Sequence, residues 1–202
     1  ENRDGIPDEA ADVLVGTPTG GTVVLSGFST YGGTTEVLGG TLLVNGMIQG
    51  DSVTVHSGAT LGGNGFVNAG VTGSVLLVDG EIAPGGWLSE TGVLTTEKAV
   101  TFGEGGSLSL QINGVFPGFD YDQLAVASMQ GISLSGDNQI HLTLGFAPQM
   151  SSEFTLIENY SEMPIDGVFA NLPDGGVISL PYDGSVYFFR ADYQGGTGND
   201  LT

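Results

Sequence analysis

The chain contains no cysteine in its 202 residues. This absence excludes a disulfide scaffold and a thiolate metal site, and it suits a bacterial exterior better than an animal one.

Basic residues are scarce as well. Three lysines and arginines stand against 23 acidic residues, which gives a formal net charge of −20. Such a surface attracts divalent cations and is repelled by phosphate backbones and anionic lipid headgroups, so we expect no nucleic acid among its partners.

Long apolar runs and helical periodicity are also missing. No apolar run approaches the roughly 20 residues of a membrane-spanning helix, and no segment repeats its apolar residues with a helical period. We therefore expect no membrane-spanning segment. The sequence begins at Glu1 without Met or a signal sequence, so we interpret it as a mature secreted product or a piece of a longer protein.

Glycine, by contrast, is abundant, with 36 residues. Because Val, Leu, Ile, Phe and Thr fill the intervals, the glycines indicate turns between short strands rather than disorder. One phrase recurs at GTVVLSG (21–27), GTLLVNG (40–46), GSVLLVDG (73–80) and GSLSLQING (106–114). Many short strands fit either a sandwich or a solenoid, and the recurring phrase favours the solenoid.

The composition changes near residue 117, beyond which aromatic residues become denser. We divide the chain into an acidic leader (1–12), a Gly-rich β-solenoid repeat region (13–116) and a C-terminal solenoid and cap region (117–202), whose aromatic residues are expected to close the core. In that last region, QIHLTLGF (139–146) alternates, which predicts a strand with Ile140 facing inward and His141 facing solvent.

Three longer segments follow one another along the chain: GTVVLSGFSTYGGTTEVLGGTLLVNG (21–46), SVTVHSGATLGGNGFV (52–67) and GEIAPGG (80–86). As an ordered series they closely resemble the autotransporter-associated β-strand repeat. Six later segments resemble the region that follows this repeat in the family: GSLSLQING (106–114), YDQLAV (121–126), GFAP (145–148), FTLIEN (154–159), GVFANLPDGG (167–176) and YQGGTGNDLT (193–202). The resemblance implies an all-β, right-handed parallel β-helix in a large surface or secreted bacterial protein, where it serves as a stalk, scaffold or adhesive passenger without enzymatic activity.

The acidic N-terminus ENRDGIPDEAAD (1–12) resembles the end of an extracellular calcium-binding repeat, in which oxygen ligands at alternate positions surround the ion. The candidate ligands for Ca²⁺ are Asn2, Asp4, Asp8 and the carbonyl of Ile6. Ala11 stands where a bidentate acid is expected, so a solvated acidic leader is the alternative interpretation.

Other acidic residues receive structural interpretations. Asp200 in GGTGNDL (195–201) echoes a calcium turn, but such sites form between stacked copies, so we favour a strand end. Asp120 and Asp122 flank Tyr121, and we interpret them as a turn and a strand start without a pocket that would separate their pKa values.

Catalysis is not expected. His56 and His141 sit beside inward-facing apolar positions and are expected to point into solvent. The sequence has no Cys, no His pair at the spacing of a zinc site and no G-x-S-x-G motif. It therefore lacks the residues that zinc chemistry and nucleophilic catalysis require. A polysaccharide-cleaving β-helix is the enzyme alternative, but only Lys98 and Arg190 are available as its base.

We therefore expect an extracellular structural or adhesive protein, secreted or at the bacterial cell surface. We also expect self-association into fibres, in which the leader or the strand ADVLV (11–15) adds to the open end of a neighbouring solenoid. The alternative function is a carbohydrate-binding adhesin that recognises surface glycans through Trp87, the one tryptophan, whose other interpretation is a turn plug.

Overall fold

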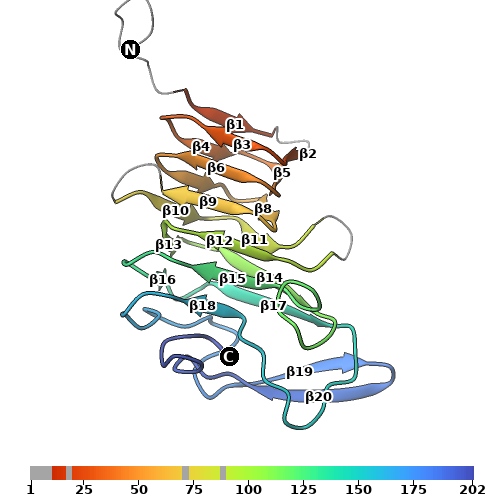
Figure 1. Ribbon diagram of the computed structural model, residues 1–202. Coiled ribbons are helices and arrows are strands. Elements are labelled where there is room, and N and C mark those ends of the chain that lie inside the picture. Colours follow the sequence, from red (N-terminus) through yellow and green to blue (C-terminus); the bar gives the residue numbers. More distant parts are fainter. Residues whose placement is uncertain (1–10, 17–19, 70–72, 87–89) are drawn as a thin grey trace, which may run out of the picture.

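The computed structural model describes residues 11–16, 20–69, 73–86 and 90–202, and this part of the chain contains strands and no helix. The strands form three parallel sheets of six strands each and one antiparallel pair. Figure 1 shows the sheets stacked as a column, with the earliest strands at one end and the antiparallel pair at the other. The expected parallel β-helix is thereby confirmed. Within the described ranges no helix is long and apolar enough to cross a membrane.

Each coil contributes one strand to each sheet. The first sheet contains β1 (Val13–Val15), β4 (Thr35–Val37), β7 (Val53–Val55), β10 (Val75–Val78), β13 (Ala99–Phe102) and β16 (Ile132–Leu134). The second contains β2 (Thr22–Leu25), β5 (Gly40–Val44), β8 (Ala59–Gly63), β11 (Glu81–Pro84), β14 (Ser107–Ile112) and β17 (Gln139–Leu144). The third contains β3 (Phe28–Thr30), β6 (Met47–Gly50), β9 (Phe66–Ala69), β12 (Val93–Thr96), β15 (Gln123–Val126) and β18 (Ile157–Asn159). A hairpin of β19 (Val177–Tyr182) and β20 (Ser185–Arg190) follows.

The core consists of apolar side chains stacked directly above one another. One ladder on the first sheet contains Val15, Val37, Val55, Val78, Phe102 and Leu134, all of them buried. Such ladders arise because alternate residues of a strand face the same side and parallel strands align in register. On β17, Ile140 is buried while His141 and Thr143 are exposed, which confirms the predicted alternation.

The coils lengthen along the chain. The register aligns Thr22, Thr41, Thr60, Glu81, Ser107 and Gln139 on the outer face of the second sheet. The first coil therefore spans 19 residues (41 − 22) and the last of this series 32 residues (139 − 107). Some of the added residues lengthen strands of the second sheet, from four residues in β2 to six in β14 and β17, and others lie in the connections between strands.

The last coil is closed by segments that satisfy the edges of its strands. The Asp166 carbonyl accepts a hydrogen bond from β16 at 2.8 Å. The side chain of Asn171 accepts from the Ile140 N–H at 2.9 Å and donates to the Ile140 carbonyl at 2.7 Å. Leu201 donates its N–H to the carbonyl of Ile157 on β18 at 3.1 Å. We call this the closed end.

Aromatic side chains fill the space beneath the closed end, as the sequence predicted. Phe154 meets Tyr121, Phe146 and Phe189 edge-on, with ring centroids 5.5 to 6.0 Å apart. Phe102 meets the fully buried Phe169 at 5.7 Å. Edge-to-face pairs of this kind stabilise a core beyond their buried area. The cap is thus a packed continuation of the solenoid core.

Candidate functional site

The N-terminal end of the column is its open end. Among the described residues, β1, β2 and β3 each pair on one side only. The Val13 N–H donates to the Thr34 carbonyl at 2.8 Å, and the Val15 carbonyl accepts from the Leu38 N–H at 2.9 Å, so these groups face β4. Because successive peptide groups of a strand point to opposite sides, the N–H and carbonyl of Leu14 point away from the column.

The other two strands of the open end have the same arrangement. The carbonyl of Leu25 on β2 and that of Gly27 before β3 accept hydrogen bonds from the next coil. The peptide groups of Val24 and Phe28 therefore point outward. The side chains at these outward positions are exposed by 65% for Leu14, 49% for Val24 and 75% for Phe28. An edge with free peptide groups and apolar side chains is a template for a further strand.

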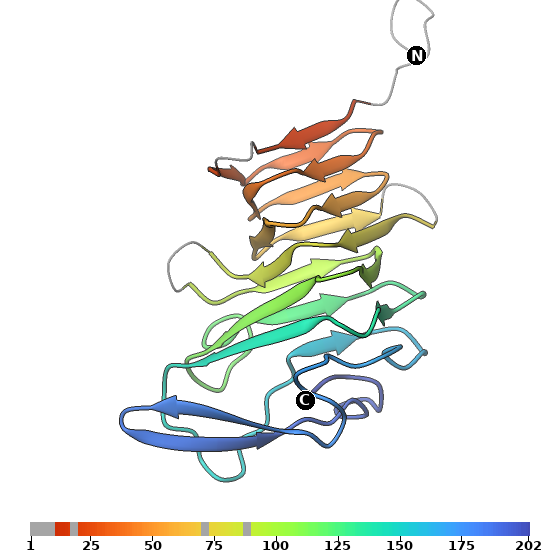
Figure 2. The same ribbon diagram turned by 180° about the vertical axis from the view of Figure 1, so that it is seen from behind.

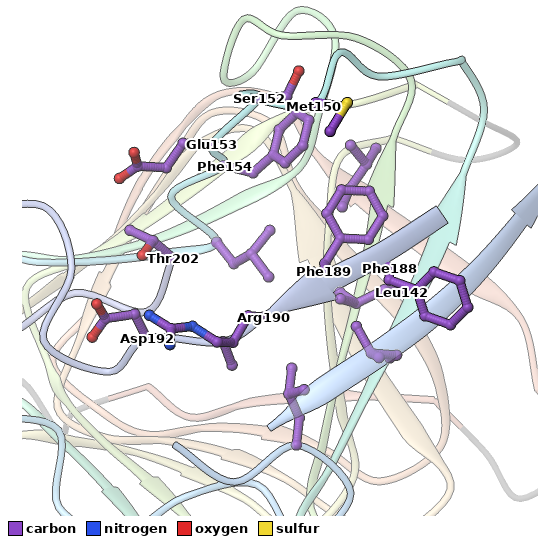
Figure 3. Close-up of a pocket in the computed structure, with 15 residues that line it drawn as sticks. Leu142, Met150, Ser152, Glu153, Phe154, Phe188, Phe189, Arg190, Asp192 and Thr202 are labelled. Carbon is purple, nitrogen blue, oxygen red and sulfur yellow. The ribbon is translucent and has the colours of Figure 1, made fainter. Parts of the chain in front are cut away.

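The closed end carries a cleft of about 350 Å³ between the last coil and the hairpin (Figure 3). Its apolar walls include Ile112, Leu142, Phe154, Leu172, Ile178 and Phe189. The cleft exists because β19 and β20 pair only with each other and rest on the last coil through side chains. Polar residues, among them Glu153 and Asp192, share this lining, and a volume of this size is within the range of small-molecule sites.

Arg190 supplies the positive charge of this cleft. It is the one exposed Lys or Arg of the described residues, because Lys98 is buried and Arg3 lies outside the described ranges. Figure 3 shows the guanidinium on the same side of the cleft as Asp192 and Glu153, apart from the apolar side. The cleft therefore presents one guanidinium together with two carboxylates beside its apolar residues.

Residues 113–120, here named the finger loop, lie in the connection from β14 to β15, on the side toward which the hairpin extends (Figures 1 and 2). The loop begins after Ile112, which lines the cleft, and it ends before Tyr121, which meets Phe154 edge to face. Three apolar side chains of the finger loop are exposed: Val115 by 49%, Phe116 by 64% and Phe119 by 88%.

The finger loop is held by hydrogen bonds. Asp120 Oδ2 accepts from the N–H groups of Val115 and Phe116, each at 3.2 Å. The Asp120 carbonyl accepts from the Asn113 N–H at 2.7 Å. From the neighbouring coil, the Thr91 hydroxyl donates to the Phe119 carbonyl at 2.7 Å. The exposed phenyl rings are therefore presented by an ordered backbone, which lowers the entropy lost on binding.

Asp122 is a buried carboxyl that the sequence interpretation missed. Its side chain accepts hydrogen bonds from the Gly92 N–H at 2.9 Å and the Gln111 N–H at 2.8 Å. Burial raises the pKa of Asp122 to about 6, and the two hydrogen bonds offset this only in part. Asp122 borders a cavity of about 170 Å³ together with Ser109 and His141. The expectation that no pocket would shift this carboxyl was wrong, because the packed coils bury Asp122 between Gln111 of its own coil and Gly92 of the coil before.

Lys98 is buried rather than placed in a cleft. Its ammonium group donates to the Gly50 carbonyl at 2.9 Å, to the Asp51 carbonyl and to the Ser74 hydroxyl at 3.3 Å. Burial lowers the pKa of Lys98, while the charges of Asp51 and Glu97 act in the opposite direction. This arrangement satisfies carbonyl groups at a corner between coils.

The remaining candidate residues are Asp200, His56 and His141. Asp200 is buried, and its carboxylate accepts from the Asn159 N–H at 2.7 Å and the Thr197 N–H at 2.9 Å. His56 is partly exposed, but its Nε2 is buried 3.3 Å from Glu36 Oε2 without a hydrogen bond, so the expectation that it points into solvent holds only in part. His141 is exposed, as predicted. In the described ranges no three His, Cys, Asp or Glu side chains gather as a metal site would require.

The predicted calcium ligands Asn2, Asp4, Ile6 and Asp8 and the predicted glycan contact Trp87 lie outside the described residues. Calcium binding and glycan binding therefore stay predictions of the sequence.

Comparison with known proteins returned no match: no family model, no curated protein and no solved structure is significantly similar to this chain. The resemblance to the autotransporter-associated repeat is thus a prediction. The structural features that bear on function lie at the two ends of the column.

Proposed function

We propose that this chain is a structural, non-catalytic β-solenoid module of the bacterial cell exterior that assembles by strand addition at its open end. The observation that carries the proposal is the row of outward peptide groups at Leu14, Val24 and Phe28, one on each sheet of the first coil. Three sheet edges that end in one coil form a template with the cross-section of the solenoid itself. The partner that matches this cross-section is another open end.

The asymmetry of the column determines the mode of assembly. At the closed end the edges of β16, β17 and β18 are already bonded to Asp166, Asn171 and Leu201. Head-to-tail addition therefore meets covered edges on β16 and β18 of its second partner, and an edge covered at Ile140 on β17. Two copies join open end to open end, which gives a closed two-fold contact instead of unlimited growth.

Composition supports the same proposal. A chain of formal charge −20 without cysteine suits secretion by a bacterium and a role as a soluble spacer or adhesive stalk. The long-range repulsion between two such chains is screened by salt, so the open-end contact strengthens as ionic strength rises.

Leu14→Pro tests the proposal. Proline removes the outward N–H of β1 while the bonds of Val13 and Val15 to the neighbouring coil remain. Leu14→Ser is the matched control, because it trims the same exposed side chain and keeps the N–H. Light scattering across a concentration series should show weaker association for Leu14→Pro than for wild type and Leu14→Ser, with circular dichroism confirming that all three fold. Equal masses for Leu14→Pro and wild type at every concentration contradict the proposal.

A further inference from the structure

Three Asn-Gly pairs begin equivalent corners of the column. The pair 45–46 follows β5, the pair 64–65 follows β8 and the pair 113–114 follows β14. These strands all belong to the second sheet, so each pair begins the connection toward the third sheet. The asparagine of each pair is exposed to solvent. The three pairs therefore share their residues, their place in the coil and their exposure.

In the first two pairs, the glycine N–H is bonded to the coil before it. The Gly46 N–H donates to the Leu25 carbonyl of β2 at 2.9 Å. The Gly65 N–H donates to the Val44 carbonyl of β5 at 2.8 Å. Each bond joins two stacked coils, so releasing either N–H requires the coils to separate locally, which costs free energy.

The third pair differs because it begins the finger loop. The Asn113 N–H donates to the Asp120 carbonyl within the loop. Asp120 Oδ2 accepts from the N–H groups of Val115 and Phe116. The Gly114 N–H between them has no hydrogen-bond acceptor among the residues that the structure describes. The inserted loop therefore removes the bond between coils that the other two glycines make.

From this difference we propose that Asn113 is a site of spontaneous deamidation in the folded chain and that the fold protects Asn45 and Asn64. The Gly114 nitrogen loses its proton to hydroxide and attacks Cγ of Asn113. A C–N bond forms, the bond from Cγ to the side-chain nitrogen breaks, and ammonia leaves with a proton from water. Water then opens the cyclic imide to aspartate or isoaspartate at position 113.

The state of the glycine N–H decides the rate because its nitrogen is the nucleophile. Glycine favours the attack, since it has no side chain that crowds the nitrogen. A nitrogen that donates to the coil before it keeps its proton and cannot turn toward the asparagine side chain until that bond opens. Gly114 has no such bond to break, so its attack requires only a movement within the exposed loop.

Deamidation at Asn113 changes the loop that presents Phe116 and Phe119. It adds a negative charge one residue from Gly114, where a Cβ would lie 2.7 Å from Asp120 Oδ2. Like charges at this distance repel, and isoaspartate also lengthens the main chain by one carbon. The hydrogen bonds of Asp120 that hold the finger loop are therefore weakened in the product.

The three asparagines are compared in one sample of wild type. The folded chain is incubated in mildly alkaline buffer, and peptide mass spectrometry follows deamidation and isoaspartate at each position. Asn113 should convert at least about tenfold faster than Asn64. Asn64 is the matched control, because the acceptor of its glycine lies on the second coil, away from the open end. In urea the three positions should convert at comparable rates, since no coils remain.

Two variants assign the charge change to its position. Asn113→Gln should abolish the growth of acidic forms on ion exchange of the folded chain, because glutamine closes the corresponding ring far more slowly. Asn64→Gln should leave that growth unchanged. Equal rates at Asn113 and Asn64 in the folded chain overturn the proposal, and so does growth of acidic forms that persists in Asn113→Gln. Neither result depends on association at the open end.

Discussion

At the scale of single residues, Asp122 couples the fold to pH. Burial raises its pKa from 3.8 to about 6 in the folded chain. Between these two values the folded state binds more protons than the unfolded state, so the free energy of unfolding falls as pH rises through this window. The contribution of Asp122 to stability is therefore fully present below about pH 4 and lost above about pH 6.

Asp122→Asn removes this titration. The difference in unfolding free energy between wild type and Asp122→Asn should change by about 1–2 kcal/mol between pH 4 and pH 7, with wild type relatively more stable at the acidic end. Urea denaturation at a series of pH values measures this difference. Asp183→Asn is the control, because it removes one charge in the exposed hairpin turn, where asparagine adopts the positive φ of 46°. A pH-independent difference for Asp122→Asn contradicts the assignment.

Asp122 and Lys98 also show what residue patterns do not reveal. The sequence pattern indicated a turn and strand start for Asp122 and offered Lys98 only as a base of the enzyme alternative. Their burial depends on groups from other coils, Gly92 for Asp122 and Gly50 for Lys98. Such contacts, 30 and 48 positions apart in the sequence, require the register of the coils.

At the scale of elements, the recurring phrase of apolar residues between glycines predicted strands correctly. It did not indicate to which of the three sheets each strand belongs. The segments 21–27, 40–46 and 106–114 hold β2, β5 and β14 of the second sheet, whereas 73–80 holds β10 of the first. Every face meets the same apolar core, so the same residue types suit strands of any face. The spacing between phrases therefore did not reveal the coil length, which the register shows to increase along the chain.

The sequence predicted glycines at turns between strands, and Gly63 at the end of β8 shows that the stacking of coils is a second reason for them. Its φ is +108°, and a Cβ would lie 2.1 Å from the Val44 carbonyl oxygen of the coil before it. Gly63→Ala should lower the free energy of unfolding by about 2–4 kcal/mol, since both the backbone conformation and the stacking oppose a side chain. Thermal and urea denaturation measure the loss.

Gly58→Ala is the matched control for Gly63→Ala. Gly58 also has a positive φ, +81°, but a Cβ there meets no atom within 4 Å. Its substitution should cost about 1 kcal/mol from backbone conformation alone. Equal losses for the two variants refute stacking as the reason for glycine at corners.

At the scale of the whole molecule, the column is a one-dimensional stack in which most coils touch two neighbours and the first coil touches one. The finger loop, the cleft and the open end belong to this scale, because each depends on which segments become neighbours after the chain has wound. The sequence predicted an open end and a cap in general terms. It did not predict the cleft, since the hairpin that forms it packs against residues up to about 80 positions away, such as Ile112.

Hydrogen exchange of the backbone amides measures how local stability varies along the column. At low protein concentration, the bonded amides of β1–β3 should exchange at least about tenfold faster than those of β13–β15, because the first coil frays without a neighbour on its outer side. The Val24 amide points outward and should exchange fastest in the monomer. Rising concentration should protect it in wild type and in Leu14→Ser, since strand addition gives it an acceptor, and should leave it unprotected in Leu14→Pro. Exchange at Val24 that ignores concentration in all three chains shows that the open end does not bind a second copy.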